Sequence, residues 1–463
     1  MDRRDFLIGS GGLAAFGSSG PSLARSATAS SASALLGRWL SAFNAVDPDT
    51  YRQFIKSTMP DALAYVDDDL AVRDASGGFE LLRTAPTGPL QITAWVKDRQ
   101  WDRFSRVVLT AKTSTSIDDI TFAGAQPPEG FSIARLDERQ ALLQFDRKLS
   151  DQASGGHFAG AVLVAGRGKI LFHRAYGLAD IARGRKADIH TRYCIGSMGK
   201  MFTAVSIVQM VQAGQVRLQD LLARYLPDYP DADLAKKVTI EHLLTHTGGT
   251  GDIFGPAYDG HATLRPSDFI RLYGRRPPLF EPGARSSYSN YGYVLLGAVI
   301  EQVSGRPYEN WYDARLFRPA GMIATSATGS GADTAIPYTG APADGLKPLT
   351  PYVGVPAGGG YSTVQDLNAF ASALGDGRLL DREHLRLLLA GRAEASAMRQ
   401  PLGFVVKKRN RAECYGHGGS AEGVNGDLAV FPASSFTTVV LCNRGNPVAV
   451  NAAEFIGARL PAR

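Results

Sequence analysis

The chain has 463 residues, which is long for a single hydrophobic core, so the length favours two domains. Hydrophobic residues make up 44% of the sequence and charged residues 20%, which excludes both a disordered chain and a polytopic membrane protein. The formal net charge of +6 is small against 50 basic and 44 acidic residues, and no long run of lysine and arginine is present. We therefore expect no nucleic-acid partner.

The first residues have the pattern of an export signal. Arg3 and Arg4 precede a Phe-Leu pair, a weakly apolar stretch rich in Gly and Ala follows to about Phe16, and small residues at which a signal peptidase can cut come after it. This arrangement resembles a twin-arginine signal. The apolar run is too short to span a bilayer well. We predict an export signal at 1–27, a linker at 28–33, and a periplasmic or secreted protein with no stable membrane span after cleavage.

Residues 34–126 are predicted to form a small α+β accessory domain. The segment opens with apolar residues that share one helical face: Leu35, Leu36, Trp39, Leu40 and Phe43. Strands are expected at 90–96, 106–111 and 117–122. A helix followed by an antiparallel sheet resembles the cystatin-like domains found beside some hydrolases. No acid, base or metal constellation lies in this segment, so we expect a substrate-side or dimerisation role.

A hinge and a larger domain follow. Paired prolines resist both helix and sheet, so residues 127–139 are predicted to be a hinge before a main domain at 140–463. This domain should begin with a helix near 136–149 and a two-stranded hairpin over 160–176. The turn of the hairpin, at 166–169, contains two glycines. A strand rather than a helix follows it, which excludes a phosphate-binding loop.

The strongest chemical motif is Gly196-Ser197-Met198-Gly199-Lys200. It opens an apolar stretch in which four residues share a helical face: Met201, Ala204, Val208 and Val211. Gly214 is placed to end that helix. If the helix begins near Ser197, residues three apart lie side by side, so the serine hydroxyl and the lysine amine come within hydrogen-bonding reach. The helix N-terminus also favours negative charge that develops near the serine.

By itself, a Ser-x-x-Lys match is expected about once by chance in a chain of this length, and it favours an N-cap serine with a surface lysine. Two later motifs change this interpretation. Tyr288-Ser289-Asn290 precedes a predicted helix, and His417-Gly418-Gly419-Ser420 precedes a predicted core strand. Alone, the first indicates a partly buried aromatic residue and the second a turn with a histidine.

Together and in this order, the three motifs resemble the serine penicillin-recognising enzymes. The Tyr-Ser-Asn form of the second motif is that of class C β-lactamases, DD-peptidases and related esterases. The connecting segments 243–249 and 358–363, with Asp366, agree with this family, and the resemblance extends from about residue 140 to the end. It implies an α/β (α+β) fold of the β-lactamase/transpeptidase type, in which helices flank an antiparallel sheet. It also implies a serine hydrolase that needs no cofactor.

The resemblance assigns a role to each matching residue. Ser197 attacks a carbonyl and forms an acyl-enzyme. Lys200 accepts a proton only when neutral, so its pKa must fall well below the ordinary value of about 10.4. Tyr288 shares acid–base duty with Lys200, and which of them is the primary base stays open. Asn290 positions the substrate, and the backbone N–H groups of Ser197 and Ser420 form the oxyanion hole.

The third motif departs from the β-lactamase pattern, which has a lysine where this chain has His417. A histidine is mostly neutral at pH 7. With Gly418 and Gly419 it is implied to bind substrate, and it shifts the expectation toward an ester or amide, as in a carboxylesterase or a D-Ala-type peptidase. A β-lactamase and a penicillin-binding or sensor protein with negligible turnover are the alternatives. The expected partner is a small-molecule or peptide substrate, and the oligomeric state stays open.

Three rival chemistries are disfavoured. His242 and His246 stand four apart, as in zinc-binding helices, but the glutamate that activates water is missing, so we expect no metal. Cys194 lacks a Cys–His arrangement, and the odd number of cysteines, with Cys414 and Cys442, makes no disulfide framework. The segment after Gly418 lacks the last glycine of a lipase elbow.

Overall fold

The computed structural model describes residues 28–254, 258, 260–340, 342, 345–390 and 401–462. The expected export signal at 1–27 lies outside the described residues. Within the described part of the chain, no helix combines the length and the apolar character that a membrane span requires.

The described residues fall into two compact units. The first contains the described residues up to Asp137, together with Arg409–Arg411 and Glu454–Leu460. The second contains the described residues of Glu138–Lys408 and Ala412–Ala453. The short segments from late in the chain are bound into the first unit by hydrogen bonds: the Asn410 side-chain amide donates to the carbonyl oxygens of Ile133 and Ala458, each at 2.8 Å.

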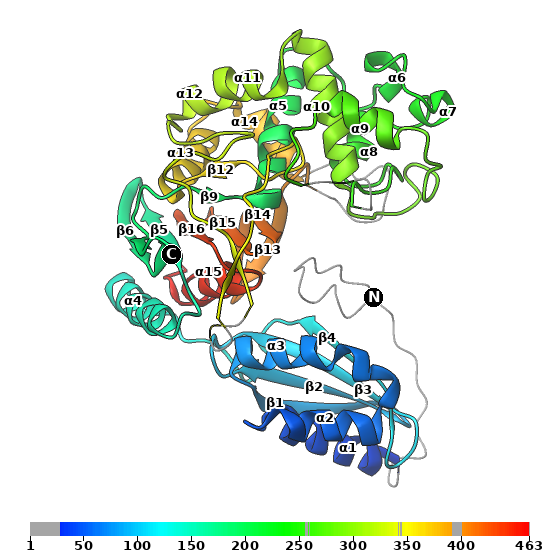
Figure 1. Cartoon of the computed structure of the whole chain (residues 1–463), viewed down its shortest axis with the longest axis vertical. Coiled ribbons are helices and arrows are strands. Elements are labelled where there is room, and N and C mark those ends of the chain that lie inside the picture. The colour runs from blue at the N-terminus through cyan, green and yellow to red at the C-terminus, as the bar shows by residue number, and fades with distance from the viewer. Residues whose placement is uncertain are drawn as a thin grey trace. The chain divides into compact units, whose positions relative to one another are not determined.

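The first unit consists of helices followed by a sheet, as Figure 1 shows in blue and cyan. Its helices are α1 (Thr28–Phe43), α2 (Pro48–Thr58), η2 (Pro60–Tyr65) and α3 (Val66–Ser76). Its four antiparallel strands follow in sequence order: β1 (Phe79–Gly88), β2 (Gln91–Asp98), β3 (Phe104–Ala111) and β4 (Ile117–Gly124). The core lies between α1 and the sheet, and the expected stripe of α1 is buried apart from Leu40, which is half-buried.

Three features of this unit differ from the sequence predictions. Residues 28–33, expected to be a linker, form the first turns of α1. The helices α2 and α3 and the strand β1 were not predicted. Most of β1 is exposed or half-buried, so its residues carry no clear alternation, and α3 opens with three consecutive aspartates, which weaken any apolar stripe. The resemblance to cystatin-like domains stays a prediction.

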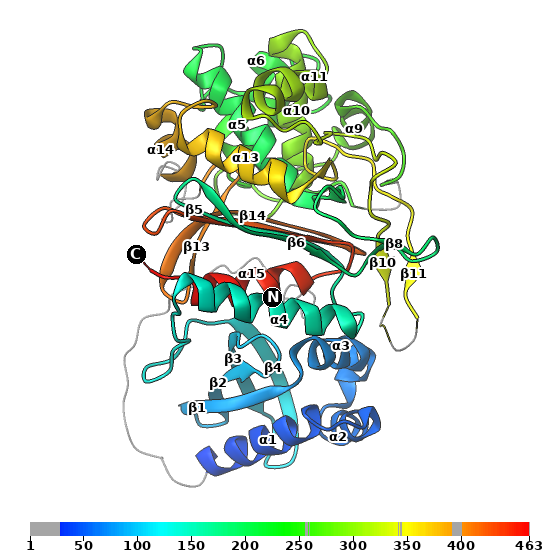
Figure 2. The ribbon, with the colours of Figure 1, turned by 90° about the vertical axis from the view of Figure 1, so that its left-hand side faces the viewer.

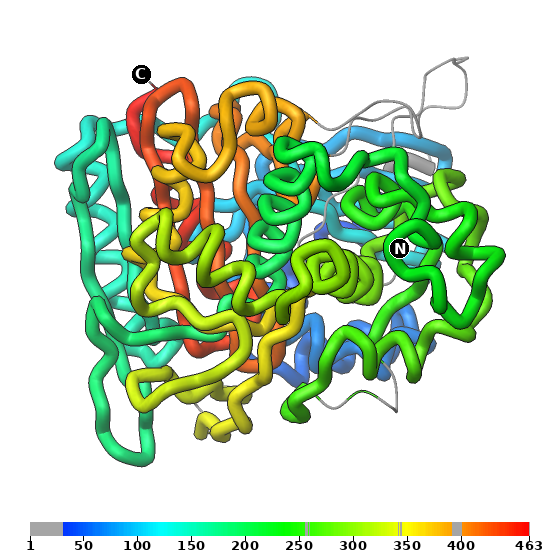
Figure 3. Tube along the Cα trace, turned by 90° about the horizontal axis from the view of Figure 1, so that it is seen from above, coloured from blue at the N-terminus to red at the C-terminus, as the bar shows by residue number. Residues whose placement is uncertain are grey.

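The second unit is built on a six-stranded sheet with the order β13-β14-β15-β16-β5-β6. The strands are β5 (Gly160–Gly166), β6 (Lys169–Tyr176), β13 (Val405–Arg409), β14 (Ala412–Ala421), β15 (Val424–Phe431) and β16 (Phe436–Cys442). The hairpin from the start of the unit therefore pairs with strands from its end, with Gly160 opposite Cys442. Figure 3 shows this juxtaposition of the teal β5–β6 hairpin and the red and orange strands.

Helices cover both faces of this sheet, as Figure 2 shows. On one face lie α4 (Glu138–Ser154) and α15 (Val448–Arg459), and on the other lies α13 (Val364–Gly375), which packs on β16 and β5. Beyond α13 is a helical region that contains α5 (Gly199–Gln212), α10 (Asn290–Ser304) and α14 (Arg382–Ala390).

Shorter elements complete the second unit. Its other helices are η3 (Gly196–Met198), α6 (Leu222–Tyr225), α7 (Ala232–Ala235), α8 (Ile240–Leu244), α9 (Pro266–Tyr273), α11 (Tyr308–Tyr312), η4 (Asp313–Phe317) and α12 (Arg318–Ala320). The short strands pair as β7 (Leu178–Asp180) with β8 (Arg185–Lys186), β9 (Tyr193–Cys194) with β12 (Tyr361–Ser362), and β10 (Tyr338–Thr339) with β11 (Lys347–Pro348).

The helix α5 is buried on almost every side. The sequence predicted one apolar face, yet Lys200, Thr203 and Ser206 on other faces are each 0% exposed. A helix that is apolar nearly all round is expected at the centre of a large domain rather than on its surface. The α-helix begins at Gly199, after the single 3₁₀ turn η3, and Gly214 beyond its end has a φ of +69°. Its N-terminal end is thereby held rigidly inside the unit.

Candidate active site

Ser197 is half-buried in the η3 turn, which the sheet approaches unusually closely. Gly196 has a φ of +51°, and a Cβ atom on it would lie 2.9 Å from the backbone nitrogen of Ser420 in β14. A Cβ atom on Gly419 would collide with the carbonyl oxygen of Ile195. Glycine at both positions therefore allows β14 to lie directly against the turn. This contact brings the Ser420 amide next to the turn that carries Ser197.

A glycine-rich loop holds the other side of this turn. The Gly359 N–H donates to the carbonyl of Gly196 at 3.1 Å, and the Ile195 N–H donates to the carbonyl of Gly360 at 2.8 Å. A Cβ atom on Gly358 would lie 3.0 Å from the nitrogen of Ser197. The segment 358–363, noted in the sequence only for its resemblance, is thus a second backbone contact, besides β14, that fixes the position of Ser197.

Lys200 lies one helical turn after Ser197, and its side chain is completely buried. Its Nζ donates to Asn290 Oδ1 at 2.6 Å and to the Ala357 carbonyl at 2.7 Å, and it lies 3.4 Å from Ser197 Oγ. Burial lowers the pKa of Lys200 to about 7, and the negative charge of Asp252 partly opposes that shift. A substantial fraction of this amine is therefore neutral near pH 7.

Asn290 links Lys200 to a carboxylate that the sequence did not single out. Its amide nitrogen donates to Oδ1 and Oδ2 of Asp252 at 3.0 and 3.1 Å, while its amide oxygen accepts from Lys200. Both ends of the amide are thus engaged. No recognisable motif contains Asp252, and only the folded chain brings it beside Asn290.

The Tyr288-Ser289-Asn290 motif ends a loop and begins α10. Ser289 is the N-cap: its hydroxyl accepts from the Gly292 N–H at 2.9 Å and donates to the Gly251 carbonyl. The Tyr288 hydroxyl interacts with the Ser197 side chain. Burial of that hydroxyl raises the pKa of Tyr288 above its ordinary value, and the contact with Ser197 opposes the shift. The middle residue of the motif is therefore structural, and its neighbours reach the site.

The residues of the third motif, His417 to Ser420, lie within β14 rather than in a turn before a strand. Burial and the positive charge of Lys200 lower the pKa of His417 to about 4, and its Nδ1 is bonded to the Gly418 carbonyl. His417 is therefore neutral at pH 7. The buried Asn425, which the sequence did not indicate, donates to the Gly419 carbonyl at 2.9 Å and supports this part of β14.

The two histidines with zinc-like spacing do not share a helix. The helix α8 ends at Leu244, and His246 has a φ of +59°. Nδ1 of His242 accepts from the Thr239 N–H, and Nδ1 of His246 accepts from the Ser289 N–H. His246 stacks on Tyr288 with ring centroids 4.5 Å apart, so the end of this segment lies beside the site.

The Cys194 thiol is a poor nucleophile. It is buried, its Sγ donates to the Gly359 carbonyl, and burial raises its pKa to about 12. All three cysteines are buried and free of disulfides.

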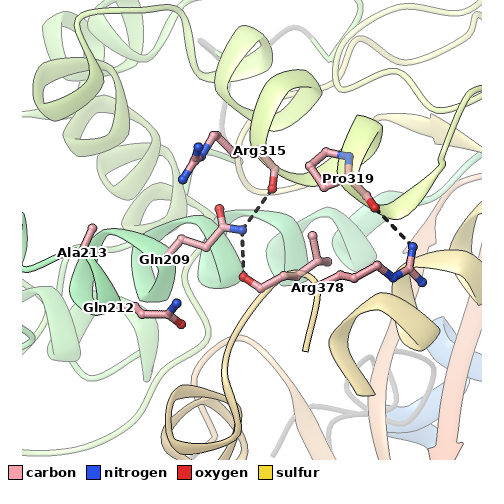
Figure 4. A pocket seen from close by; sticks show the side chains of 7 residues that line it. Gln209, Gln212, Ala213, Arg315, Pro319 and Arg378 are labelled. Carbon is pink, nitrogen blue, oxygen red and sulfur yellow. Dashed lines mark hydrogen bonds between the residues drawn. The ribbon is translucent and has the colours of Figure 1, made fainter. Parts of the chain in front are cut away.

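A separate pocket of about 300 Å³ lies at the other end of α5 (Figure 4). Its lining includes Gln209, whose amide donates to the carbonyls of Arg315 and Leu379. With a rise of about 1.5 Å per residue, the length of α5 separates this pocket from Ser197. It is not part of the serine site.

The site described above agrees with the comparison with known families. Residues 145–460 match the family described as Beta-lactamase. The chain belongs to the beta-lactamase family. Its combination of helices and an antiparallel sheet is the β-lactamase/transpeptidase fold predicted from the motifs.

The chain is also similar to several known proteins, over part of its length. It is 35% identical over 173 residues to penicillin-binding protein 4* of Bacillus subtilis and 34% identical over 221 residues to esterase EstB of Burkholderia gladioli. These alignments cover 36% and 43% of this chain, and 38% and 54% of the two relatives. The crystal structure of a penicillin-binding protein from Bacillus halodurans matches with a TM-score of 0.60 and 28% identity, over 69% of this chain and 98% of that one.

The close approach of β14 to η3 generates a stability prediction. Gly214→Ala places a Cβ atom in open space at a positive φ and should cost about 1 kcal/mol. Gly196→Ala carries the same backbone penalty and adds a collision with Ser420, so it should cost at least about 1 kcal/mol more. Urea unfolding of both variants and the wild type measures the difference. Equal losses for the two variants would contradict the close packing of β14 on the turn that carries Ser197.

Proposed function

We propose that this protein is a serine hydrolase that transfers an acyl group from an ester or amide first to Ser197 and then to water. The observation that carries this proposal is the environment of Lys200, a fully buried amine beside a half-buried serine. A neutral amine has two N–H groups and one lone pair. Asn290 and Ala357 accept the two N–H groups at short distances, which leaves the lone pair for the Ser197 hydroxyl.

The pKa shifts support Lys200 as the base and Tyr288 as the acid. The pKa of Lys200 falls to about 7, whereas that of Tyr288 rises above its ordinary value. Lys200 therefore takes the proton as Ser197 Oγ bonds to the substrate carbonyl carbon. Tyr288 gives its proton to the leaving group as the ester or amide bond of the substrate breaks. The proton that Lys200 took from Ser197 then passes to Tyr288 and restores its hydroxyl. A water molecule then attacks the acyl-enzyme with the same proton transfers in reverse, which releases the carboxylic acid and regenerates Ser197.

The backbone and the remaining predicted residues have supporting roles in this proposal. The Ser197 and Ser420 N–H groups are proposed as the oxyanion hole, supported by the close packing of η3 on β14. Gly418 and Gly419 border the substrate. Asn290 is bonded to both Lys200 and Asp252, so its main task is to orient the base, beside any contact with substrate.

The substrate class follows from the charge at position 417. His417 is neutral at pH 7, so it offers no permanent cation for the carboxylate that β-lactams carry. An ester, or an amide without a carboxylate beside the reacting group, needs no such cation to react, whereas a D-Ala-D-Ala peptide ends in a carboxylate that another contact must hold. The similarity to an esterase supports this assignment. Efficient β-lactam hydrolysis and acylation without turnover are the competing outcomes of the test below.

Removal of the nucleophile tests the assignment directly. Ser197→Ala should reduce turnover by at least about 10³-fold and abolish covalent labelling by a serine-directed phosphonate. Intact-mass measurements after exposure to a p-nitrophenyl ester, a D-Ala-D-Ala peptide and a cephalosporin should show a transient acyl adduct for one of the first two. A persistent adduct from the cephalosporin alone indicates a penicillin-binding or sensor protein.

The chain offers a matched control for that experiment. Ser206 lies in α5, the helix that follows Ser197, and its hydroxyl is buried without a hydrogen-bond partner. Ser206→Ala should therefore retain both labelling and turnover. If Ser197→Ala behaves like Ser206→Ala, Ser197 is not the nucleophile.

The charge of Asp252 predicts a pH effect. Lys200 acts as a base only when neutral, so kcat/KM should rise with pH through the Lys200 pKa of about 7. The negative charge of Asp252 raises that pKa, so Asp252→Asn should move the acidic limb of the pH profile to lower pH. Asp228→Asn, which changes an exposed carboxylate, should leave the limb in place. A shift to higher pH in Asp252→Asn argues against Lys200 as the base.

We also propose that the protein is exported through a twin-arginine route. Support comes from the Arg3-Arg4 pair, the short apolar stretch and the small residues after it. In a Gram-negative host, Arg3→Lys together with Arg4→Lys should leave the full-length protein in the cytoplasm, whereas the wild type reaches the periplasm with a shortened N-terminus. Cell fractionation with mass analysis of the N-terminus measures this. Equal export of both proteins refutes the twin-arginine route.

A further inference from the structure

Tyr288 is held by one residue from a distant part of the sequence, His246. The carbonyl of His246 accepts from the Ser287 N–H at 2.9 Å, and its Nδ1 accepts from the Ser289 N–H at 3.1 Å. Its ring stacks on the ring of Tyr288 between those two bonds, at 4.5 Å and an interplanar angle of 29°. Three consecutive residues therefore contact the same histidine.

His246 is itself held in place by Tyr293. Its ring lies 5.1 Å from that of Tyr293, which is completely buried on α10. The Tyr293 hydroxyl donates to the carbonyl of Leu244 at 2.8 Å, so it also fixes the backbone just before His246. The φ of +59° at His246 is unfavourable for a residue with a side chain. Such conformations persist where the surroundings enforce them, and they concentrate at functional sites.

The imidazole of His246 is held in its neutral form. Burial lowers its pKa to about 3, and the electrostatic interactions with Lys200 and His417 act in the same direction. Nδ1 therefore keeps its lone pair for the Ser289 N–H over the whole working range of pH, with the ring proton on Nε2. A neutral ring can stack on Tyr288 without adding charge beside the acid and base of the site.

Tyr288 needs this support because its surroundings leave it partly unconstrained. The residue as a whole is 41% exposed although its hydroxyl is buried, and it belongs to the loop before α10. Its hydroxyl must nevertheless stay at hydrogen-bonding distance from Ser197 for proton transfer. Small misplacements of reacting groups cost up to about 10²-fold in rate.

We propose that His246 is the positioning residue for Tyr288, holding the phenol at Ser197 through the ring stack and the two backbone bonds. This inference rests on the proposed function, since it assumes that Tyr288 exchanges protons in acyl transfer to Ser197. His246 does not itself contact the reacting atoms. Its effect on rate should therefore depend on the Tyr288 hydroxyl.

A double-mutant cycle tests this dependence, with the rate of Ser197 labelling by a phosphonate as the readout. His246→Ala should slow labelling by about 10- to 100-fold in the wild-type background. In a Tyr288→Phe background, the same substitution should slow labelling by less than about 3-fold, because no hydroxyl remains to be positioned. An equal loss in both backgrounds overturns the proposal and assigns His246 a general structural role. Unchanged labelling in the single variant also overturns it.

Two further variants separate the contacts and guard against misfolding. His246→Asn keeps an acceptor for the Ser289 N–H and tolerates a positive φ but lacks the ring, whereas His246→Phe keeps the ring and lacks the acceptor. Ser197 should be labelled faster in each of these variants than in His246→Ala. If the alanine variant does not fold, the cycle is run with the asparagine variant. The control is His242→Asn, because His242 Nδ1 also accepts a backbone N–H but does not contact Tyr288. Its labelling rate should match the wild type.

The outcomes distinguish this inference from the proposed function. If Ser197 is not the nucleophile, the phosphonate still labels Ser197→Ala, and the proposed function fails before the cycle is run. If the phosphonate does not label Ser197→Ala but labels His246→Ala at the wild-type rate, only the proposed role of His246 fails.

Discussion

The burial of one amine sets the requirements that the rest of the active site meets. Lys200 lies at the start of a helix surrounded by the core, where a lone ammonium group is costly. Burial brings its pKa to about 7, and in the proposed function this allows Lys200 to act as a base in neutral solution. The Asn290 and Ala357 oxygens satisfy its N–H groups, and the negative charge of Asp252 partly opposes the shift. Without these acceptors, the buried amine would carry unsatisfied donors.

The second constraint is the closeness of backbone around Ser197. The strand β14, the turn η3 and the loop with Gly358 approach one another more closely than side chains allow, so glycine recurs at the contacts. The sheet thereby reaches the helix N-terminus without an intervening layer. This arrangement places backbone N–H groups, the serine and the lysine on one rigid support, and rigid support is what electrostatic stabilisation of an oxyanion requires.

A third constraint is the number of positive charges near Ser197. Both nearby histidines, His246 and His417, have pKa values far below 7, because burial and the neighbouring lysine disfavour a second positive charge. Lys200 is consequently the group near Ser197 that titrates close to neutral pH, and Asp252 supplies negative charge beyond Asn290. In the proposed function, this balance suits substrates without a carboxylate beside the reacting group, in contrast to the lysine-containing third motif of β-lactamases.

The sequence alone determined the family, the main strands and the residue pairs with chemical meaning, because Ser197, Lys200 and the two later motifs are local patterns in a diagnostic order. It also placed α1 and the strands from β2 to β4, whose apolar periodicity is strong. It missed α2, α3 and β1, which lack such periodicity, and it predicted one buried face for α5, which the fold surrounds. Only the tertiary structure decided the partners of Lys200, the contact of His246 with Tyr288 and the role of Asp252. These contacts join residues about 40 to 160 positions apart, and such distances in sequence leave no local pattern.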